Sequence, residues 1–315
     1  MGRCRGGLTG MLLAAGYGQR MEPLSSQIPK PALPVLDRPL LAASLDSLWR
    51  AGCQRVVVNL HRHPERVAAA VRDCPLGREV IFSFEPTLLG PAGGLAAVKP
   101  YFPPGPVLVA NADAWAQLDL TPLLAAGDPQ KVVLGLVAHP NWRRWASVHL
   151  AGDGRVLRIT EPGESQEGYL FTGFQLVGSQ ALRLLPPPPA PMGSFWQPLI
   201  QQGKLYGVLL QGQFREAGDP GSYWDLVMTV LGGENFVHPQ ARVHHQARLE
   251  ASAVSAGVLV EPAAYLRSCV LLPGTTVAEG AQLKDCVVKG LVPPWSRREG
   301  CLLLEGVAPL PLLRS

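Results

Sequence analysis

The chain is predicted to fold as an α/β domain with a mostly parallel sheet, followed by a short domain of stacked parallel β-coils. From residue 8 to about residue 230, short apolar runs alternate with segments of helical periodicity. This alternation is typical of βαβ units, with helices on both faces of a sheet. After Gly233 the apolar residues recur every six positions instead. We therefore expect one domain over residues 1–233 and a second over residues 234–315.

The elements of the first domain follow from residue type and spacing. Strands are expected where apolar and β-branched residues form short runs, and helices where apolar residues lie three and four apart. The expected strands cover 11–15, 55–60, 80–84, 107–110, 132–137, 169–177 and 205–210, and the expected helices cover 40–51, 64–73, 92–99, 120–126 and 222–231. Ligands of such sheets bind beyond the carboxyl ends of the strands. The loops after 11–15 and 107–110 are therefore expected at the ligand edge.

The second domain is predicted from a repeat of six residues. Each repeat starts with an apolar residue, and a small or apolar residue follows four places later. The repeats start at Val237, Val243, Leu249, Leu259, Tyr265, Leu271, Val277 and Leu283. Each hexad forms one flat side of a triangular coil, so these hexads predict about three coils. The irregular interval between Leu249 and Leu259 indicates a loop at one corner.

The end of the chain predicts how the coils are completed. Residues 291–315 are expected to cap the stack or to join a partner subunit, because a solenoid must bury its open ends. The tail is apolar at Leu302-Leu303-Leu304 and from Leu310 to Leu313. Open coil faces and this tail make a large apolar surface, so we expect a homo-oligomer that forms through the second domain.

Composition limits the class of protein. A chain of 315 residues with 47% hydrophobic residues is long and apolar enough for about two domains with full cores. The net charge is only +4 and the basic residues are dispersed, so we do not expect nucleic acid as a partner. No apolar run is long enough to cross a membrane, and no signal peptide is apparent. The six cysteines form no C-x-x-C motif, which predicts reduced, mostly buried thiols and a cytoplasmic location.

The most specific local pattern is a glycine turn directly after the first expected strand. It contains Ala14, Ala15, Gly16 and Gly18, and Arg20 follows it. Glycines at such a turn let backbone N–H groups approach a phosphate, and nearby cations neutralise the phosphate charge. No G-K-[ST] follows, and no third glycine stands at the spacing of a dinucleotide fingerprint. The turn therefore predicts a polyphosphate site that is neither a P-loop nor a dinucleotide fold.

Residues 13–40 resemble the signature of the sugar-1-phosphate nucleotidylyltransferases, also called nucleotide-sugar pyrophosphorylases. The resemblance rests on L-A-A-G-x-G-x-R-M-x-P-L, followed by P-K-P-x-L-P-V. It implies a Rossmann-like nucleotidyltransferase domain that joins an NTP to a sugar 1-phosphate and releases pyrophosphate. In that family the residue matching Arg20 grips the leaving pyrophosphate, and the residue matching Lys30 contacts the triphosphate or the attacking phosphate. The hexad repeat resembles the left-handed parallel β-helix.

The same resemblance implies a Mg²⁺ cofactor and its ligands. Asn111-Ala112-Asp113 resembles the N-G-D element of the family, which makes Asp113 the first metal ligand. The second family ligand is the aspartate of a W-x-D-x-G-T element, and residues 214–219 stand in its place. Glu216 is favoured there, although its extra methylene shifts the carboxylate. Asp219 is a rival ligand or an N-cap of the following helix.

Two further segments resemble the base and sugar sites of the family. The first contains Glu85, Gly90 and Gly93 and is similar to E-P-x-x-L-G-T-A-G-x-L, which packs on the nucleobase in the family. It is most like the segment of mannose-1-phosphate guanylyltransferases, so we expect GTP as the preferred nucleotide and UTP next. The glycines are expected to let the backbone contact base edges.

On the sugar side, Glu161 matches the glutamate of the family's E-K-P element, but the lysine is missing. Thr172 and Gly173 match the strand that lines the sugar pocket. The charge of the missing lysine must then come from one of three arginines, which are Arg143, Arg144 and Arg158.

Two alternatives compete with the transferase hypothesis. The first is a catalytically weakened homologue that binds a nucleotide sugar and regulates a partner enzyme. Two departures from the family pattern indicate it: Glu216 in place of the aspartate, and the missing lysine. The histidines of the early hexads, His238, His244 and His245, are residues that hexapeptide-repeat acyltransferases use as a general base. About three coils form a short groove for an acyl carrier, so this second alternative is the weaker one.

Overall fold

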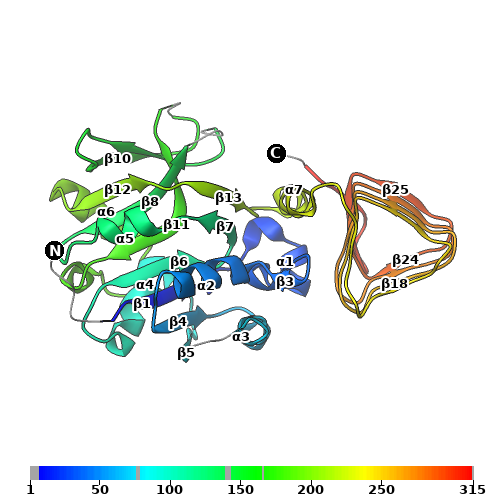
Figure 1. Ribbon diagram of the computed structural model, residues 1–315, viewed down its shortest axis with the longest axis horizontal. Helices are drawn as coiled ribbons and strands as arrows, with labels where there is room; N and C mark the ends of the chain where they lie inside the picture. Colours follow the sequence, from blue (N-terminus) through cyan, green and yellow to red (C-terminus); the bar gives the residue numbers. More distant parts are fainter. Residues whose placement is uncertain (1–6, 76–78, 139–142, 165–166, 314–315) are drawn as a thin grey trace. The chain divides into compact units, whose positions relative to one another are not determined.

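The computed structural model describes residues 7–75, 79–138, 143–164 and 167–313 (Figure 1). These residues form two compact units. The first contains residues up to 17 together with 41–215, and the second contains 18–40 together with the chain from 216 onward. The expected boundary between residues 233 and 234 therefore falls inside the second unit. The segment 18–40, which follows the glycine turn, leaves the first unit and packs in the second.

In the described part of the chain, the first unit is built around a nine-stranded sheet. Its order is β10-β9-β11-β6-β1-β4-β5, and β8 joins β11 to β12. Strands β5, β4, β1 and β6 are mutually parallel, whereas β11 is antiparallel to β6 and β8. The strands are β1 (Thr9–Leu13), β4 (Arg55–Leu60), β5 (Glu79–Phe84), β6 (Val107–Asn111), β8 (Val132–Ala138), β9 (Ser147–Leu150), β10 (Val156–Thr160), β11 (Tyr169–Val177) and β12 (Leu205–Leu209). This is the expected α/β architecture with a mixed, mostly parallel sheet.

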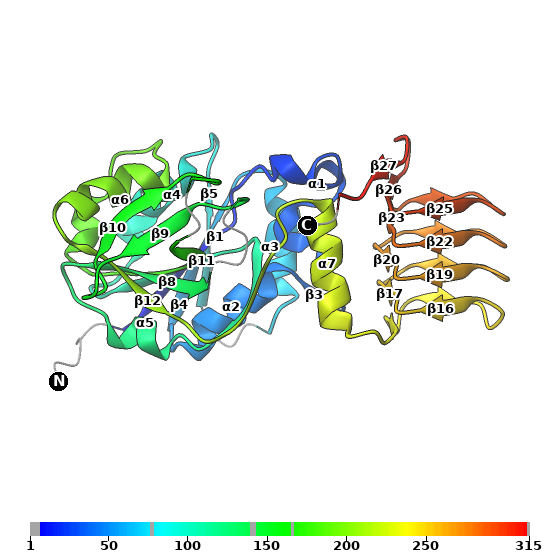
Figure 2. The same cartoon turned by 90° about the horizontal axis from the view of Figure 1, so that it is seen from above.

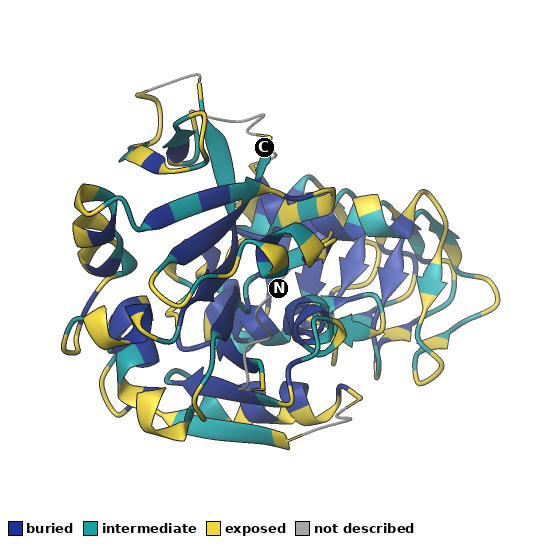
Figure 3. Cartoon of the chain, turned by 60° about the vertical axis from the view of Figure 1, so that its left-hand side comes forward, coloured by how far each residue is buried: buried dark blue, intermediate teal, exposed yellow. Residues whose placement is uncertain are grey.

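Helices pack on this sheet and bury one face against it. Their bounds are α2 (Leu41–Arg50), α3 (Pro64–Arg72), α4 (Gly90–Val98), α5 (Thr121–Ala125) and α6 (Met192–Gln201). Figure 3 shows the central strands as buried. The core that they form contains Met11, Val57, Val109 and Leu134, all without solvent exposure. Burial of apolar side chains on both sheet faces is the main stabilising term for such a unit.

Several elements of this unit were not expected. They are α6, β9, β10 and a two-stranded pair of β7 (Ala114–Leu118) with β13 (Gly212–Glu216). Helix α6 has Pro198 inside it, which conceals its helical pattern. The first strand ends at Leu13 rather than at residue 15, because the Ala14 N–H donates to Asn59 Oδ1 instead of to a strand partner.

The second unit begins with short elements of the 18–40 segment and with helix α7. The bounds are η1 (Gln19–Met21), α1 (Leu24–Gln27), η2 (Lys30–Ala32), β2 (Pro34–Val35), β3 (Arg38–Pro39) and α7 (Pro220–Leu231). The fully buried Tyr223 of α7 donates a hydrogen bond from its hydroxyl to the Pro34 carbonyl. This contact holds the 18–40 segment against α7.

The remainder of the second unit is a left-handed parallel β-helix of triangular cross-section (Figure 1), whose coils are stacked as rungs (Figure 2). Corresponding strands of successive coils pair in parallel and make three sheets. The strands are β14 (Phe236–Val237), β15 (Arg242–Val243), β16 (Arg248–Glu250), β17 (Ala253–Val254), β18 (Leu259–Val260), β19 (Tyr265–Arg267), β20 (Val270–Leu271), β21 (Thr276–Val277), β22 (Gln282–Lys284), β23 (Val287–Lys289), β24 (Leu291–Val292), β25 (Arg297–Glu299), β26 (Cys301–Leu304) and β27 (Leu310–Pro311).

The described β-helix has more coils than expected. Four complete coils run from β14 to β25, and β26 begins a fifth, whereas about three were expected. Residues 291–315 were expected to cap the stack or to join a partner subunit, but residues 291–304 continue the coils. Leu302 and Leu304 are buried, so neither contributes to an exposed apolar tail. Strand β27, which pairs antiparallel with β26, covers an edge of the last coil.

The register of the repeat also differs from the expected one. Ala253 pairs with Val270, and Val270 pairs with Val287, so each of these coils takes 17 residues rather than three full hexads. The next coil is shorter still, because Val287 pairs with Leu302, 15 residues on. Because a 17-residue coil is one residue short of 18, the inward positions of the second coil differ from the expected ones. Val260 and Leu266 are buried in the second coil, while their expected counterparts differ: Leu259 is exposed and Tyr265 is half-buried.

Left-handed backbone at one corner explains the short coil. Ala251, Ser268 and Asp285 stand at equivalent corners and have φ between 46° and 54°. The residue after each corner residue bonds back across it. Ser252 Oγ donates to the Glu250 carbonyl, and the thiols of Cys269 and Cys286 donate in the same way. The irregular interval after Leu249 is therefore this tight corner, and not a loop.

The cysteine prediction is confirmed in the part of the chain that the structure describes. Cys53, Cys74, Cys269, Cys286 and Cys301 are all buried, free thiols, and Cys4 lies outside the described residues. A hydrogen bond to Cys269 and burial both raise the pKa of Cys286. These thiols therefore act as packing groups.

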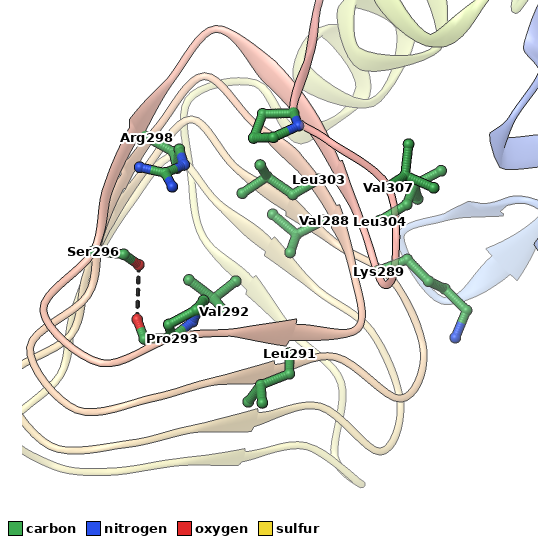
Figure 4. A pocket seen from close by; sticks show the side chains of 11 residues that line it. Val288, Lys289, Leu291, Val292, Pro293, Ser296, Arg298, Leu303, Leu304 and Val307 are labelled. Atoms are coloured by element: carbon green, nitrogen blue, oxygen red, sulfur yellow. Dashed lines mark hydrogen bonds between the residues drawn. The ribbon is translucent and has the colours of Figure 1, made fainter.

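In the fourth coil, a charged side chain replaces one of the apolar side chains of the earlier coils (Figure 4). Val288, Val292 and Leu303 point into the triangle, whereas Lys289 and Leu291 point away from it. Arg298 occupies the column that Leu249, Leu266 and Leu283 form in the earlier coils. A cation at this position ends the apolar column.

The observed register predicts that neighbouring positions differ in their effect on stability. Leu266→Ala should lower the free energy of unfolding by about 2–5 kcal/mol, because it opens a cavity inside the coil. Leu259→Ala, which makes the same chemical change on the outer face, should stay within about 0.5 kcal/mol of the unaltered protein. Urea unfolding measures both. Equal losses for the two variants would contradict the 17-residue coil.

Candidate functional site

The parallel strands of the first unit bring several loops to one edge of the sheet. In the ladder around β1, Leu13 pairs with Asn59 of β4 on one side and with Asn111 of β6 on the other. The next residues along the chain, Ala14 and Ala112, therefore leave the sheet at the same level. Ala112 N donates to the Leu13 carbonyl at 3.0 Å. The glycine turn and the Asn111-Ala112-Asp113 element thus meet at the carboxyl edge, as expected.

Residues 14–17, which we call the phosphate loop, are held at both ends. The buried Ala14 donates its N–H to Asn59 Oδ1 at 2.8 Å, and Ala15 is buried behind it. At the other end, Arg62 Nη1 donates to the Tyr17 carbonyl at 3.1 Å. Between them Gly16 is exposed, and a Cβ placed there would meet no atom within 4 Å. The backbone of this loop is therefore fixed and open to a ligand.

The expected cations lie in the second unit. Gly18, with φ of 64°, begins the 18–40 segment, and its carbonyl accepts a hydrogen bond from Ser25 Oγ. Lys30 is buried within this segment. Arg20 is more than half exposed and forms an ion pair with Glu216, at 3.3 Å between Nη2 and Oε1. An exposed ion pair contributes little to stability, so Arg20 can exchange its partner for a phosphate at small cost.

Asp113 stands between two strands of the first unit. It follows β6 and directly precedes β7, the strand that pairs with β13. Glu216 is the last residue of β13. Each carries a carboxylate, the hard oxygen donor that Mg²⁺ prefers, so the residue types fit the expected cofactor. Among the described residues, no group of three or more His, Cys, Asp or Glu side chains gathers as a metal cluster.

The structure resolves the role of Asp219. Its Oδ1 accepts from Ser222 N at 2.8 Å, and Ser222 Oγ accepts from Asp219 N at 2.9 Å. This reciprocal pair is a capping box at the start of α7. The N-cap interpretation of Asp219 is thus confirmed, and Glu216 is left as the stronger candidate for a metal ligand.

Residues 85–94, which we call the base segment, are more internally bonded than expected. The Glu85 carboxylate is 2% exposed and accepts from Asn59 Nδ2 at 2.8 Å and from Leu89 N at 3.0 Å. The Gly93 N–H donates to the Ala190 carbonyl. Gly90, with φ of 74°, lies so close that a Cβ would be 2.5 Å from the same carbonyl. These glycines therefore permit close backbone packing against Ala190.

Two of the expected sugar residues, Thr172 and Gly173, lie on β11. Thr172 and Gly173 form a bulge in β11, where the register with β8 shifts between Phe171 and Gln175. The buried Thr172 hydroxyl donates to the Gly135 carbonyl. Gly173, with φ of 83°, leaves room for the side chain of Asn111, since a Cβ would be 2.9 Å from that residue. The bulge thus fits the strand to the Asn111-Ala112-Asp113 element.

The other sugar-side candidates belong to the β9–β10 hairpin and the loop before it. Glu161 is exposed and follows β10. Arg158 pairs with His149 across the hairpin, and burial and the Arg158 guanidinium lower the pKa of His149. Arg144 lies over the ring of Trp145, and Arg143 is exposed. Arg158 is therefore the candidate cation nearest in sequence to Glu161.

Sequence reasoning missed the residues at the end of β4. Asn59 bonds both the phosphate loop and Glu85, His61 Nδ1 bonds the Glu85 carbonyl at 2.8 Å, and Arg62 bonds Tyr17. The ring of His61 also packs edge-on against Tyr17. Asn59 lies at the carboxyl end of the expected strand 55–60, and His61 and Arg62 follow it, so the rule that placed ligand groups at carboxyl ends would have found them.

None of the described helices is long and apolar enough to cross a membrane. Comparison with known proteins gives one family match, as the model of the nucleotidyl transferase family aligns with residues 9–231.

Among curated relatives, the chain is 24% identical to the mannose-1-phosphate guanyltransferase of Pichia angusta, covering 96% of this chain and 91% of that protein. It is 29% identical to the N-acetylmuramate alpha-1-phosphate uridylyltransferase of Caulobacter vibrioides, covering 67% of this chain and 91% of that protein.

Among solved structures, the fold is similar to that of HddC from Yersinia pseudotuberculosis, with a TM-score of 0.62 and 22% identity. That similarity covers 70% of this chain and 99% of HddC.

Proposed function

Because the chain belongs to the nucleotidyl transferase family, we propose that it transfers a nucleotidyl group from an NTP to a sugar 1-phosphate. The products would be a nucleotide sugar and pyrophosphate. The observation that carries this proposal is the position of the phosphate loop. Its exposed Gly16 lies at the sheet edge where Asp113 also leaves the sheet.

The proposed reaction is a direct displacement. An oxygen of the sugar phosphate attacks the α-phosphorus of the NTP, a new P–O bond forms, and the bond to the β-phosphate breaks. Pyrophosphate carries away the electron pair of that bond, so no covalent enzyme intermediate is required. Catalysis then depends on positioning and on neutralising charge.

Within this proposal, the residues divide these two tasks. Gly16 and its neighbours in the phosphate loop would present N–H groups to the triphosphate, and Lys30 would contribute a fixed positive charge. Arg20 would stabilise the negative charge that builds on the leaving pyrophosphate. Asp113 and Glu216 would hold Mg²⁺, which neutralises triphosphate charge when bound.

The nucleotide that we propose is GTP, with UTP next. The base segment is most like that of guanylyltransferases, and the relatives include a guanyltransferase and a uridylyltransferase. For the sugar phosphate, Glu161 would contact hydroxyls, and Arg158 would supply the charge of the missing family lysine.

A screen for pyrophosphate release tests this function. Each NTP is incubated with a panel of sugar 1-phosphates and Mg²⁺, and turnover should appear with GTP or UTP. The alternative of a weakened regulatory homologue is favoured by the glutamate at position 216 and the missing lysine. Binding of a nucleotide sugar without any pyrophosphate release across the panel would support that alternative.

Asp113→Ala should lower turnover at least about 100-fold, because the triphosphate charge loses its metal bridge. The fold should persist, since Asp113 lies at a half-buried strand end. Asp153→Ala is the matched control, because Asp153 is an exposed turn residue paired only locally with Arg155. Steady-state kinetics at saturating substrates compare the two. Equal turnover in both variants would remove Asp113 from the proposed mechanism.

Glu216→Asp should shift the Mg²⁺ concentration for half-maximal rate about tenfold, in either direction, because it moves the carboxylate by about 1.5 Å. The comparison is Asp219→Asn, which keeps an equally good N-cap but removes the charge. A Mg²⁺ titration of the rate should show a change only in Glu216→Asp. A change only in Asp219→Asn would make Asp219 the ligand instead.

We also propose that the β-helix mediates self-association. Leu291, Trp295 and Leu313 are 63%, 68% and 78% exposed, which leaves an apolar surface on the last coil and the tail. Light scattering at micromolar concentration should report a dimer or a larger assembly, and Trp295→Lys should reduce its mass. A monomeric mass for the unaltered protein would count against this proposal.

A further inference from the structure

We propose that Asn59 and Glu85 form a positioning bridge between the phosphate loop and the base segment, and that the Glu85 carboxylate does not contact the nucleobase. The inference rests on the proposed function, because it assigns these two segments to one nucleotide. Asn59 would be a positioning residue, and Glu85 would act through it. Base selection would then depend on other groups of the base segment.

The amide of Asn59 has one possible orientation. Its Oδ1 lies 2.8 Å from the Ala14 N–H, which is a donor, and its Nδ2 lies 2.8 Å from Glu85 Oε1, which is an acceptor. Asn59 is 3% exposed, so water does not compete for either bond. One side chain therefore links the backbone of the phosphate loop to a charge on the base segment.

The carboxylate of Glu85 is used internally at both oxygens. Oε1 accepts from Asn59, and Oε2 accepts from the N–H of Leu89, the residue before α4. The main chain of Glu85 is bonded as well, since its carbonyl accepts from His61 Nδ1. At 2% exposure, the carboxylate faces these donors and not a ligand. A buried charge of this kind needs such partners.

Gly94 lies directly beside the Asn59–Glu85 bridge, and its missing side chain leaves room for that bridge. A Cβ at Gly94 would stand 2.7 Å from Glu85 Oε1 and 2.8 Å from Asn59 Nδ2. Any larger residue would push the two groups apart. Glycine in the middle of α4 therefore leaves the space that the Asn59–Glu85 bridge occupies.

The bridge fixes two segments that a nucleotide must contact together. If either bond is lost, the loop and the segment no longer share one fixed spacing, and part of the binding energy is spent on ordering them. Because the bridge touches no base, its loss should weaken every NTP by the same factor. A base-contacting carboxylate would instead change the ranking of the NTPs.

Exchanging the amide and the carboxylate between positions 59 and 85 tests this inference. Asn59→Asp keeps the acceptor for Ala14 but sets two carboxylates against each other. Glu85→Gln sets two amide groups against each other. The double variant Asn59→Asp with Glu85→Gln restores the pattern, because the new amide at position 85 would donate to the new carboxylate at position 59 and accept from the Leu89 N–H. The double variant has the same net charge as the unaltered protein.

Each single variant should raise KM at least about tenfold for every NTP that supports turnover, and the double variant should return KM to within about threefold of the unaltered value. The ranking of the NTPs should be the same in all four proteins. In the ligand-free proteins, hydrogen exchange at the amides of Ala14 and Leu89 should be faster in the single variants and restored in the double variant. If Asn59→Asp does not fold, Glu85→Gln alone against the double variant gives the same comparison.

Three results would overturn the inference. The first is a changed NTP ranking in Glu85→Gln that the double variant does not restore, which would place the carboxylate on the base. The second is a double variant that remains as impaired as the single variants. The third is unchanged amide exchange in the single variants. If the unaltered protein releases no pyrophosphate with any NTP, the proposed function fails, while the exchange experiment still decides whether the bridge holds the two segments.

Discussion

The parallel pairing of β1 between β4 and β6 is the constraint on which the site depends. Because the three strands run in the same direction and in register at Leu13, Asn59 and Asn111, their loops must leave the sheet side by side. Residues far apart in the sequence thereby meet at one edge. The phosphate loop receives its fixed shape from β4, through Asn59 and Arg62, rather than from its own sequence. A ligand at this edge therefore meets a surface that is already ordered.

The second unit also depends on parallel strand pairing, in this case between successive coils. Each coil is only 15 to 17 residues long, so its stability comes from columns of side chains that repeat from coil to coil. The left-handed corners at Ala251, Ser268 and Asp285 make the short coil possible, and the buried thiols satisfy the corner carbonyls. These cysteines are consequently explained by packing and hydrogen bonding alone.

Much of the fold could be predicted from the sequence, because its patterns are local. The strands at 55–60 and 169–177 were predicted with their observed bounds, and the glycine turn and Asp113 are at the predicted edge. The roles of Glu85 and Gly93 could not be predicted, since their partners, Asn59 and Ala190, lie in distant segments. The coil register was predicted one residue out of phase at Leu259, because the irregular interval after Leu249 was assigned to a loop and not to a tight left-handed corner.

Hydrogen–deuterium exchange of the unaltered protein, with and without GTP and Mg²⁺, tests the central claim most directly. That claim is that the carboxyl edge of the parallel sheet is the nucleotide site. The account predicts slower exchange in residues 14–17, 86–94 and 111–113 when nucleotide is present, with no change in the coils from β14 to β25. Protection confined to those coils, or no protection at the sheet edge at saturating nucleotide, would contradict it.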